Sequence, residues 1–259
     1  QFNDDRIKEI LKIIKSQKNT TYIFSETDYP FIIKNNNIVD FFQKYLSNNN
    51  SIIIGGIRKD ENQYYNSIYF ITKDYFQLFD KTILVPFGEF LPFRNYLRFL
   101  ENIVGSADLE KGKLNRLIKT NFNLNFIPVI CYEIIFFNDL LSTINQNSPL
   151  LINITNDAWF GKHSGPYQHF YLSRIRSTEF NKFLIRVSNN GVSAIVDNYG
   201  RIVNYIPLNQ KGKKNLSIKI PLELNNLIDF HYLIYLVITA VIIIAIAIER
   251  KIEKLQPKL

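Results

Sequence analysis

The single cysteine of the chain stands where a side chain could react. Cys131 closes the apolar run in VICYEI and precedes FFNDLLSTI, which has the pattern of a helix. A side chain at such a strand-to-turn position is presented at the edge of a sheet. A thiol there can act as a nucleophile when a nearby base or positive charge favours the thiolate. The competing interpretation is a small buried core residue, because a free cysteine packs like a small apolar side chain.

Two charged residues have a similar setting. Glu26 follows the strand-like TYIFS, and Lys81 lies in DKTILVPFGEF. A charge after an apolar strand usually marks the point where the strand leaves the core. However, strand ends on one edge of a sheet converge in space, which is how α/β enzymes assemble their sites. Together with Cys131, these positions suggest a site that contains a thiol, a carboxylate and an ammonium group.

Composition weighs against several other kinds of site. One cysteine allows no intrachain disulfide and no cysteine-based zinc cluster. His163 and His169 have no third candidate ligand nearby, so we expect structural or substrate-facing roles for them rather than a metal site. The net charge is +8, but the Lys and Arg residues are scattered and no stripe of them interleaves with aromatic residues. We therefore expect no nucleic-acid partner.

The elements that must position these residues alternate along the chain. Helical patterns cover residues 4–17, 38–46, 136–144 and 165–181, and residues 93–104 fit a helix or a loop with helical turns. Strand patterns cover residues 21–25, 51–57, 65–72, 126–131, 150–155, 183–188, 192–197 and 201–205. This alternation, with hairpins near the end, predicts a layered α/β sandwich.

A long apolar segment lies near the C-terminus. Residues 232–248 read YLIYLVITAVIIIAIAI, and with residues 227–231 they can cross a hydrocarbon core of about 30 Å at about 1.5 Å per residue. Basic residues follow it at four positions: Arg250, Lys251, Lys254 and Lys258. We therefore expect a transmembrane helix with a cytoplasmic tail and an extracytoplasmic main domain. The alternative is a buried core helix, which the all-round apolar surface makes the weaker choice.

Longer strings give these residues a more specific context. They are KTILVPFGEFLPF, VICYEI, NITNDAWFGKHSGPYQH, RIRSTE and RVSNNGVSAIVDNYGR, which begin at Lys81, Val129, Asn153, Arg174 and Arg186. Together they resemble the nitrilase (carbon–nitrogen hydrolase) superfamily and, within it, the bacterial apolipoprotein N-acyltransferases. The similarity runs from about Glu26 to the end of the chain. It implies an α/β fold, namely a nitrilase-like four-layer α-β-β-α sandwich followed by one transmembrane helix.

The resemblance implies roles for individual residues. Cys131 is expected to be the nucleophile, Glu26 the general base and Lys81 the stabiliser of the oxyanion. Supporting residues are expected at three further positions: Glu89, Tyr132 and Glu133. Trp159, in NDAWFG, is expected to pack near the site, and contact with the acyl chain is the weaker alternative. The resemblance implies neither a cofactor nor a metal.

The implied reaction transfers an acyl chain. Cys131 attacks a phospholipid acyl ester, and a lysophospholipid departs from a thioester on the sulfur. The N-terminal amine of a diacylglyceryl-modified lipoprotein then takes the acyl group. The expected partners are a phospholipid donor, a lipoprotein acceptor and the membrane. The expected place is the bacterial inner membrane, with the catalytic domain on the periplasmic side.

This interpretation also divides the chain. It predicts a catalytic domain over residues 1–222, a juxtamembrane linker over 223–231, a transmembrane helix over 232–248 and a basic cytoplasmic tail over 249–259. The chain starts with Gln1 and contains no Met, so we expect that an upstream part is missing. That part would include the multi-helix membrane domain that precedes the catalytic domain in this family.

Two other functions stay open. The first is a hydrolase of the same fold that acts on small amides or nitriles, with water as the final acceptor. The apolar C-terminal segment and LVPFGE weigh against it. The second is a non-catalytic, membrane-anchored interaction domain. The presence of Glu26, Lys81 and Cys131 weighs against it. Residues 90–100, FLPFRNYLRFL, fit a lipid-facing surface and a packed loop equally well.

Overall fold

The structure divides into two compact units. It is a computed structural model and describes residues 2–97, 99, 108–113, 115–120, 124–144, 148–221 and 228–255. The larger unit is Gln1–Leu224 and contains two sheets, and the smaller is Asn225–Leu259 and contains one long helix.

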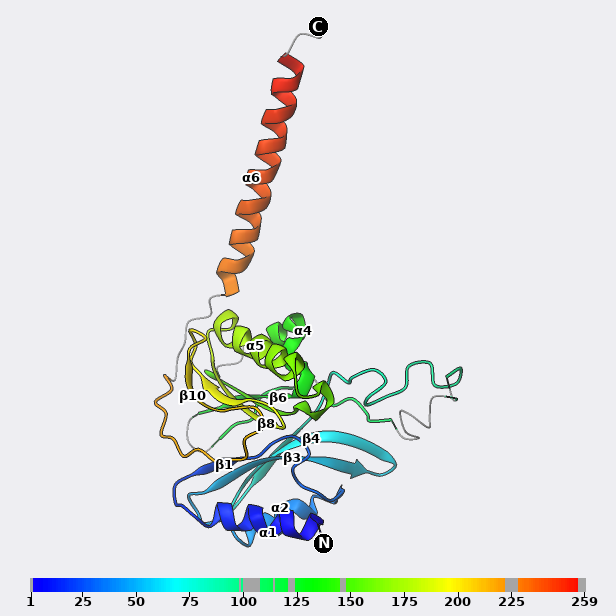
Figure 1. Cartoon of the computed structure of the whole chain (residues 1–259), viewed down its shortest axis with the longest axis vertical. Helices are drawn as coiled ribbons and strands as arrows, with labels where there is room; N and C mark the ends of the chain where they lie inside the picture. The colour runs from blue at the N-terminus through cyan, green and yellow to red at the C-terminus, as the bar shows by residue number, and fades with distance from the viewer. Residues whose placement is uncertain are drawn as a thin grey trace. The chain divides into compact units, whose positions relative to one another are not determined.

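The first part of the larger unit is a sheet with two helices on one face (Figure 1). In chain order its elements are α1 (Phe2–Ile14), β1 (Thr21–Ile23), β2 (Ile33–Lys34), α2 (Asn37–Gln43), β3 (Ser51–Asp60), β4 (Gln63–Thr72) and β5 (Phe76–Asp80). The strands pair in the order β1-β3-β4-β5, with β2 beside β3. β1 runs parallel to β3, whereas β3, β4 and β5 form an antiparallel meander.

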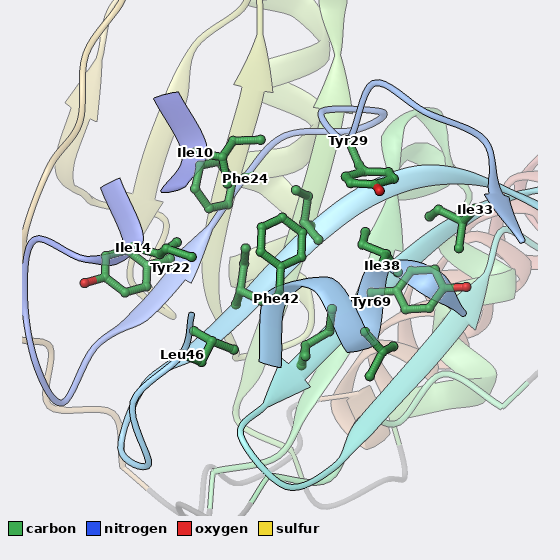
Figure 2. Close-up of a cluster of buried hydrophobic side chains, with 14 residues drawn as sticks. Ile10, Ile14, Tyr22, Phe24, Tyr29, Ile33, Ile38, Phe42, Leu46 and Tyr69 are labelled. Atoms are coloured by element: carbon green, nitrogen blue, oxygen red, sulfur yellow. The ribbon is translucent and has the colours of Figure 1, made fainter. Parts of the chain in front are cut away.

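Helices α1 and α2 bury apolar side chains against this sheet. Ile10 and Ile14 lie four residues apart and therefore on one face of α1, and both are buried. Figure 2 shows them with Phe42 of α2 and Tyr69 of β4 in one cluster. Burying a side chain of this size contributes about 1.5–3 kcal/mol relative to leaving it in water. This packing holds α1 and α2 on the outer face of the sheet.

The second part of the larger unit forms the other sheet. Its elements are β6 (Phe126–Ile130), η2 (Cys131–Ile135), α4 (Phe137–Ile144), β7 (Leu150–Asn156), η3 (Asp157–Phe160), α5 (Ser164–Glu179), β8 (Phe183–Asn189), β9 (Ser193–Val196) and β10 (Ile202–Ile206). The strand order is β10-β9-β8-β7-β6. β6, β7 and β8 are parallel, so their carboxyl ends share one edge, and α4 and α5 cover the outer face (Figure 1).

The inner faces of the two sheets pack against each other. Ile53 and Phe70 of the first sheet belong to one buried cluster with Phe126, Ile130 and Ile154 of the second. Phe70 and Phe126 meet edge to face at 5.8 Å between ring centroids. The layers are therefore helix, sheet, sheet and helix, and the predicted α-β-β-α sandwich is confirmed.

Most predicted elements occur within a few residues of their expected bounds. β2 and β5 had no predicted counterpart, because β2 has two residues and β5 has no clean alternation of apolar and polar residues. The predicted helix over residues 4–17 ends at Ile14. Residues 93–96 form turns, and 98 and 100–104 lie outside the described residues, so the helix-or-loop alternative over 93–104 stays open.

The smaller unit is the helix α6 (Ile228–Leu255). Within it, Leu233–Lys251 has a mean hydropathy of 2.4 and is long and apolar enough to cross a membrane. It is the one such helix found among the described residues. The large apolar side chains from Leu233 to Ile248 are exposed, unlike those of a buried core helix.

Candidate active site

Glu26 is held where β1 leads into a loop that continues along β3. Phe24 N donates to Ile53 O at 2.8 Å and Gly55 N donates to Ser25 O at 3.3 Å, so the loop stays beside the strand. A Cβ atom at Gly55 would meet Glu26 Cα at 2.8 Å, closer than real Cβ contacts. Only glycine lets the backbones approach this closely. The Glu26 side chain is consequently buried between the two sheets' strand ends.

Lys81 directly follows β5, and its side chain reaches toward the buried Glu26 carboxylate. Its Nζ lies 2.7 Å from Glu89 Oε1 and 3.9 Å from Glu26 Oε1, and its side chain is 1% exposed. Glu89 reaches it because LVPFGE folds back on itself. Val85 N donates to Glu89 Oε2 at 2.9 Å, and Glu89 N donates to Val85 O at 2.9 Å.

Asn66 of β4 joins the two carboxylates, although the sequence did not point to it. Its Nδ2 donates to Glu26 Oε1 at 2.7 Å and to Glu89 Oε1 at 3.2 Å. The second oxygen of Glu26 accepts from the backbone N–H of Asn156 at 2.7 Å. The sequence signal was an amide shortly before the apolar run of residues 68–71. That signal is weak, because many strand residues near a turn are polar.

Cys131 stands between β6 and η2 with a φ of 52°, in the left-handed region. Burial and the nearby Glu26 carboxylate raise the pKa of its thiol to about 12, while Lys81 opposes this rise. The Cys131 thiol in turn acts to lower the pKa of Glu26, so the two side chains are close enough to influence each other. The structure thus brings together Cys131, Glu26 and Lys81, which are far apart in the sequence.

The groups of this cluster differ in how burial and their neighbours shift their pKa values. Burial raises the pKa of Glu26 above 4.5, and Lys81 and Asn66 offset the rise only in part. Burial alone would lower the pKa of Lys81, but the Glu26 and Glu89 carboxylates beside it help to raise it above 10.5. Lys81 is therefore a fixed ammonium group, and Cys131 is a neutral thiol at rest. Such a cluster can transfer the thiol proton to Glu26 while the sulfur attacks, and Lys81 can stabilise a developing anion.

Glu133, which was predicted to support the site, lies two residues after Cys131 on η2. It is fully buried, and Arg116 donates to both of its oxygens at 2.8 and 2.9 Å. It also accepts from the backbone N–H groups of Ile130, Thr82 and Ile83 at 2.8–3.0 Å. Burial acts to raise the pKa of Glu133, but Arg116 and the backbone N–H groups together outweigh it, so the pKa is lowered. Glu133 thus ties the segment after β5 to the start of the Cys131 turn.

The aromatic and histidine predictions have different outcomes. Tyr132 is partly buried, and its ring lies near those of Phe136, Phe160 and His169. Trp159 is 82% exposed, so the prediction that it packs near the site is wrong. A residue on a short 3₁₀ turn can point outward whatever its hydrophobicity, because the turn offers no periodic inner face. His169 is buried and bonded to Asp157, which is a structural role.

Comparison with known proteins places this architecture in a family. The carbon-nitrogen hydrolase family model matches residues 19–224, which include Glu26, Lys81 and Cys131. The chain belongs to the carbon–nitrogen hydrolase family. Solved structures of this family agree in fold. A CN-hydrolase superfamily protein from Xanthomonas campestris has a TM-score of 0.55 at 18% identity, with 81% of each chain covered. Nit3 of Saccharomyces cerevisiae, a member of branch 10 of the nitrilase superfamily, has a TM-score of 0.57 at 17% identity. This similarity covers 79% of this chain and 78% of the Nit3 chain.

Several curated relatives of the chain share one name. The apolipoprotein N-acyltransferase of Rickettsia prowazekii is 44% identical over 173 residues, 64% of this chain and 35% of the relative. That of Rhizobium rhizogenes is 39% identical over 202 residues, 73% of this chain and 38% of the relative. That of Allorhizobium ampelinum is 32% identical over 241 residues, 88% of this chain and 45% of the relative. The chain therefore spans less than half the length of these relatives.

Proposed function

We propose that this chain is the catalytic part of an apolipoprotein N-acyltransferase. It moves a fatty acyl chain from a phospholipid to the N-terminal amine of a diacylglyceryl-modified lipoprotein. The observation that carries the proposal is the buried cluster of Cys131, Glu26 and Lys81, whose groups shift one another's pKa values, in a chain several of whose curated relatives bear that name. The apolar helix α6 supports it, because both substrates are lipids that reside in a membrane.

The first half-reaction loads the enzyme. Glu26 takes the proton of Cys131 as the sulfur attacks the ester carbonyl, and Lys81 stabilises the oxyanion. The ester C–O bond breaks, the proton passes from Glu26 to the leaving oxygen, and a lysophospholipid departs. The acyl group stays on the sulfur as a thioester.

The second half-reaction unloads it. The free α-amine of the lipoprotein attacks the thioester carbonyl, the C–S bond breaks, and an amide forms. Glu26 carries the amine proton back to the sulfur, which restores the neutral Cys131 thiol. Because the two half-reactions share one site, the kinetics should be ping-pong.

The proposed organisation follows the substrates. Residues 1–222 form the catalytic domain, and residues 232–248 of α6 span the inner membrane between a linker at 223–231 and a cytoplasmic tail at 249–259. The catalytic domain then lies on the periplasmic side. Protease added to spheroplasts should digest this domain, and its protection until the membrane is broken would contradict the proposed side.

A product assay separates this function from hydrolysis of small amides. Incubation of the membrane-bound protein with phospholipid and a diacylated lipopeptide should release lysophospholipid and yield a triacylated peptide. Incubation with small amides should release no ammonia above the level of the Cys131→Ser variant. Ammonia release without lysophospholipid would instead favour the amidase, which the names of the relatives do not favour. If neither ammonia nor lysophospholipid were formed, the result would favour the non-catalytic interaction domain.

The acid limb of the pH profile is expected above the ordinary range of a glutamate. Glu26 works as a base only when ionised, and burial raises its pKa above 4.5. Activity should therefore rise with pH through a midpoint higher than 4.5. The Asn66→Leu variant loses a hydrogen bond that lowers the pKa of Glu26, so its midpoint should lie higher still. The measurement is kcat/KM against pH, and a wild-type midpoint at or below 4.5 would contradict the assignment of Glu26.

A further inference from the structure

A buried polar chain connects the second sheet to the backbone of Cys131. Asn153 of β7 lies beside Val129 of β6 in the strand register. Its Nδ2 donates to the carbonyl oxygens of Val129 at 3.1 Å and of Cys131 at 3.3 Å. Its Oδ1 accepts from Arg186 Nη1 of β8 at 2.5 Å. Asn153 therefore uses the donor end of its amide toward Cys131 and the acceptor end toward Arg186.

A fully buried ion pair fixes the far end of this chain. Arg186 Nη2 donates to Asp157 Oδ2 at 2.6 Å, and neither side chain is exposed. Asp157 is itself held by His169 Nδ1 at 2.8 Å and by the Ser188 hydroxyl at 2.8 Å. The Arg186 bonds to Asp157 and Asn153 are buried, so breaking either one would leave an unpaired polar group in a low dielectric. Arg186 is therefore held against Asn153.

The same network includes two side chains of α5. The buried residues of this helix are Pro166, His169, Phe170, Ser173, Arg176 and Ser177. The Ser173 hydroxyl accepts from Arg186 Nη1 at 3.0 Å, and His169 Nδ1 lies 3.2 Å from Arg186 Nη2. His169 and Ser173 therefore form part of the polar shell around the buried Arg186 cation.

The backbone of Cys131 needs such support. A φ of 52° is unfavourable for a residue with a side chain, and it persists only where the surroundings over-determine it. On the amino side, the N–H of Ile130 is held by Glu133 at 2.9 Å. On the carbonyl side, Cys131 O is held by Asn153. The two buried side chains thus hold the nucleophile turn from both sides.

We propose that Asn153, held by the Arg186–Asp157 pair, is a positioning residue that fixes the left-handed backbone of Cys131 and so aims its thiol at Glu26. The inference rests on the proposed function, in which Cys131 is the nucleophile. Asn153 acts through the nucleophile's backbone. The Glu26 carboxylate is held separately, through Asn66.

The test uses the Asn153→Asp variant of the whole chain. This change keeps the size of the side chain and an acceptor for Arg186, but it removes both N–H donors. The readout is the rate constant for alkylation of Cys131 by iodoacetamide, followed by mass spectrometry, and the single cysteine makes every adduct unambiguous. We expect the rate to fall at least about tenfold, because small misplacements of a reacting group cost this much. Lysophospholipid release should fall in kcat with KM unchanged.

Lys182→Met is the matched control. The Nζ of Lys182 is buried and donates to Ser148 O, at the opposite end of the parallel strands. Its loss should lower thermal stability but leave the alkylation rate of the folded protein unchanged. An unchanged rate in Asn153→Asp, or an equal fall in both variants, would overturn the proposal.

Two further outcomes are informative. If Asn153→Asp does not fold, Asn153→Leu takes its place, and failure of both to fold would overturn the positioning role in favour of a purely structural one. If the wild type forms no thioester, the proposed function fails. That result leaves the alkylation comparison intact, because alkylation needs no acyl donor.

Discussion

Replacing Cys131 with serine is expected to abolish the acyl-enzyme and to lower turnover by about 10³-fold or more. A hydroxyl is far less acidic than a thiol, and the Glu26 carboxylate that must take the proton is held by Lys81 and Asn66 in one fixed position. The substitution changes one atom in a side chain that is 8% exposed, so the fold should persist.

Mass spectrometry of the protein purified from membranes measures this directly. The wild-type peptide that contains Cys131 should carry a fatty-acyl mass that hydroxylamine removes, and the Cys131→Ser peptide should carry none. An unchanged thermal midpoint in the variant is the control that excludes unfolding. A serine variant that still releases lysophospholipid at a comparable rate would mean that another group accepts the acyl chain.

Replacing Glu133 with alanine is expected to destabilise the fold by about 3–5 kcal/mol, because it leaves the buried Arg116 cation without its partner. Arg116 and Glu133 are both almost completely buried, and Glu133 also satisfies three backbone N–H groups. The loss should appear as a lower midpoint in urea unfolding of the intact chain.

The control for this prediction is an exposed ion pair. Lys8 and Asp5 are 3.4 Å apart with side chains 76% and 64% exposed, so Asp5→Ala should leave the midpoint unchanged. Glu133→Gln retains an acceptor for the backbone N–H groups and should be less destabilising than Glu133→Ala. If Glu133→Ala kept wild-type stability while turnover was lost, Glu133 would act in the chemistry rather than as a tie between segments.

Local patterns of residues predicted a layered α/β sandwich, and the resemblance of the longer strings predicted its four-layer order. The helical pattern over residues 4–17 predicted α1, and apolar runs predicted β6 and β7. Position at strand ends, with the resemblance of the longer strings, pointed to Glu26, Lys81 and Cys131. Each of these inferences depends on side-chain periodicity or on short strings, which are properties of neighbouring residues.

Only the tertiary structure decided how these groups act on one another. The left-handed backbone of Cys131, the sharing of one ammonium by Glu26 and Glu89, and the exposure of Trp159 all arise from contacts between distant segments. Asn66 and Asn153 were not singled out, because an amide in a strand has no local mark of what lies opposite it. The physical reason is that pKa values and backbone strain depend on burial and on non-local partners, which come into being only when the two sheets pack together.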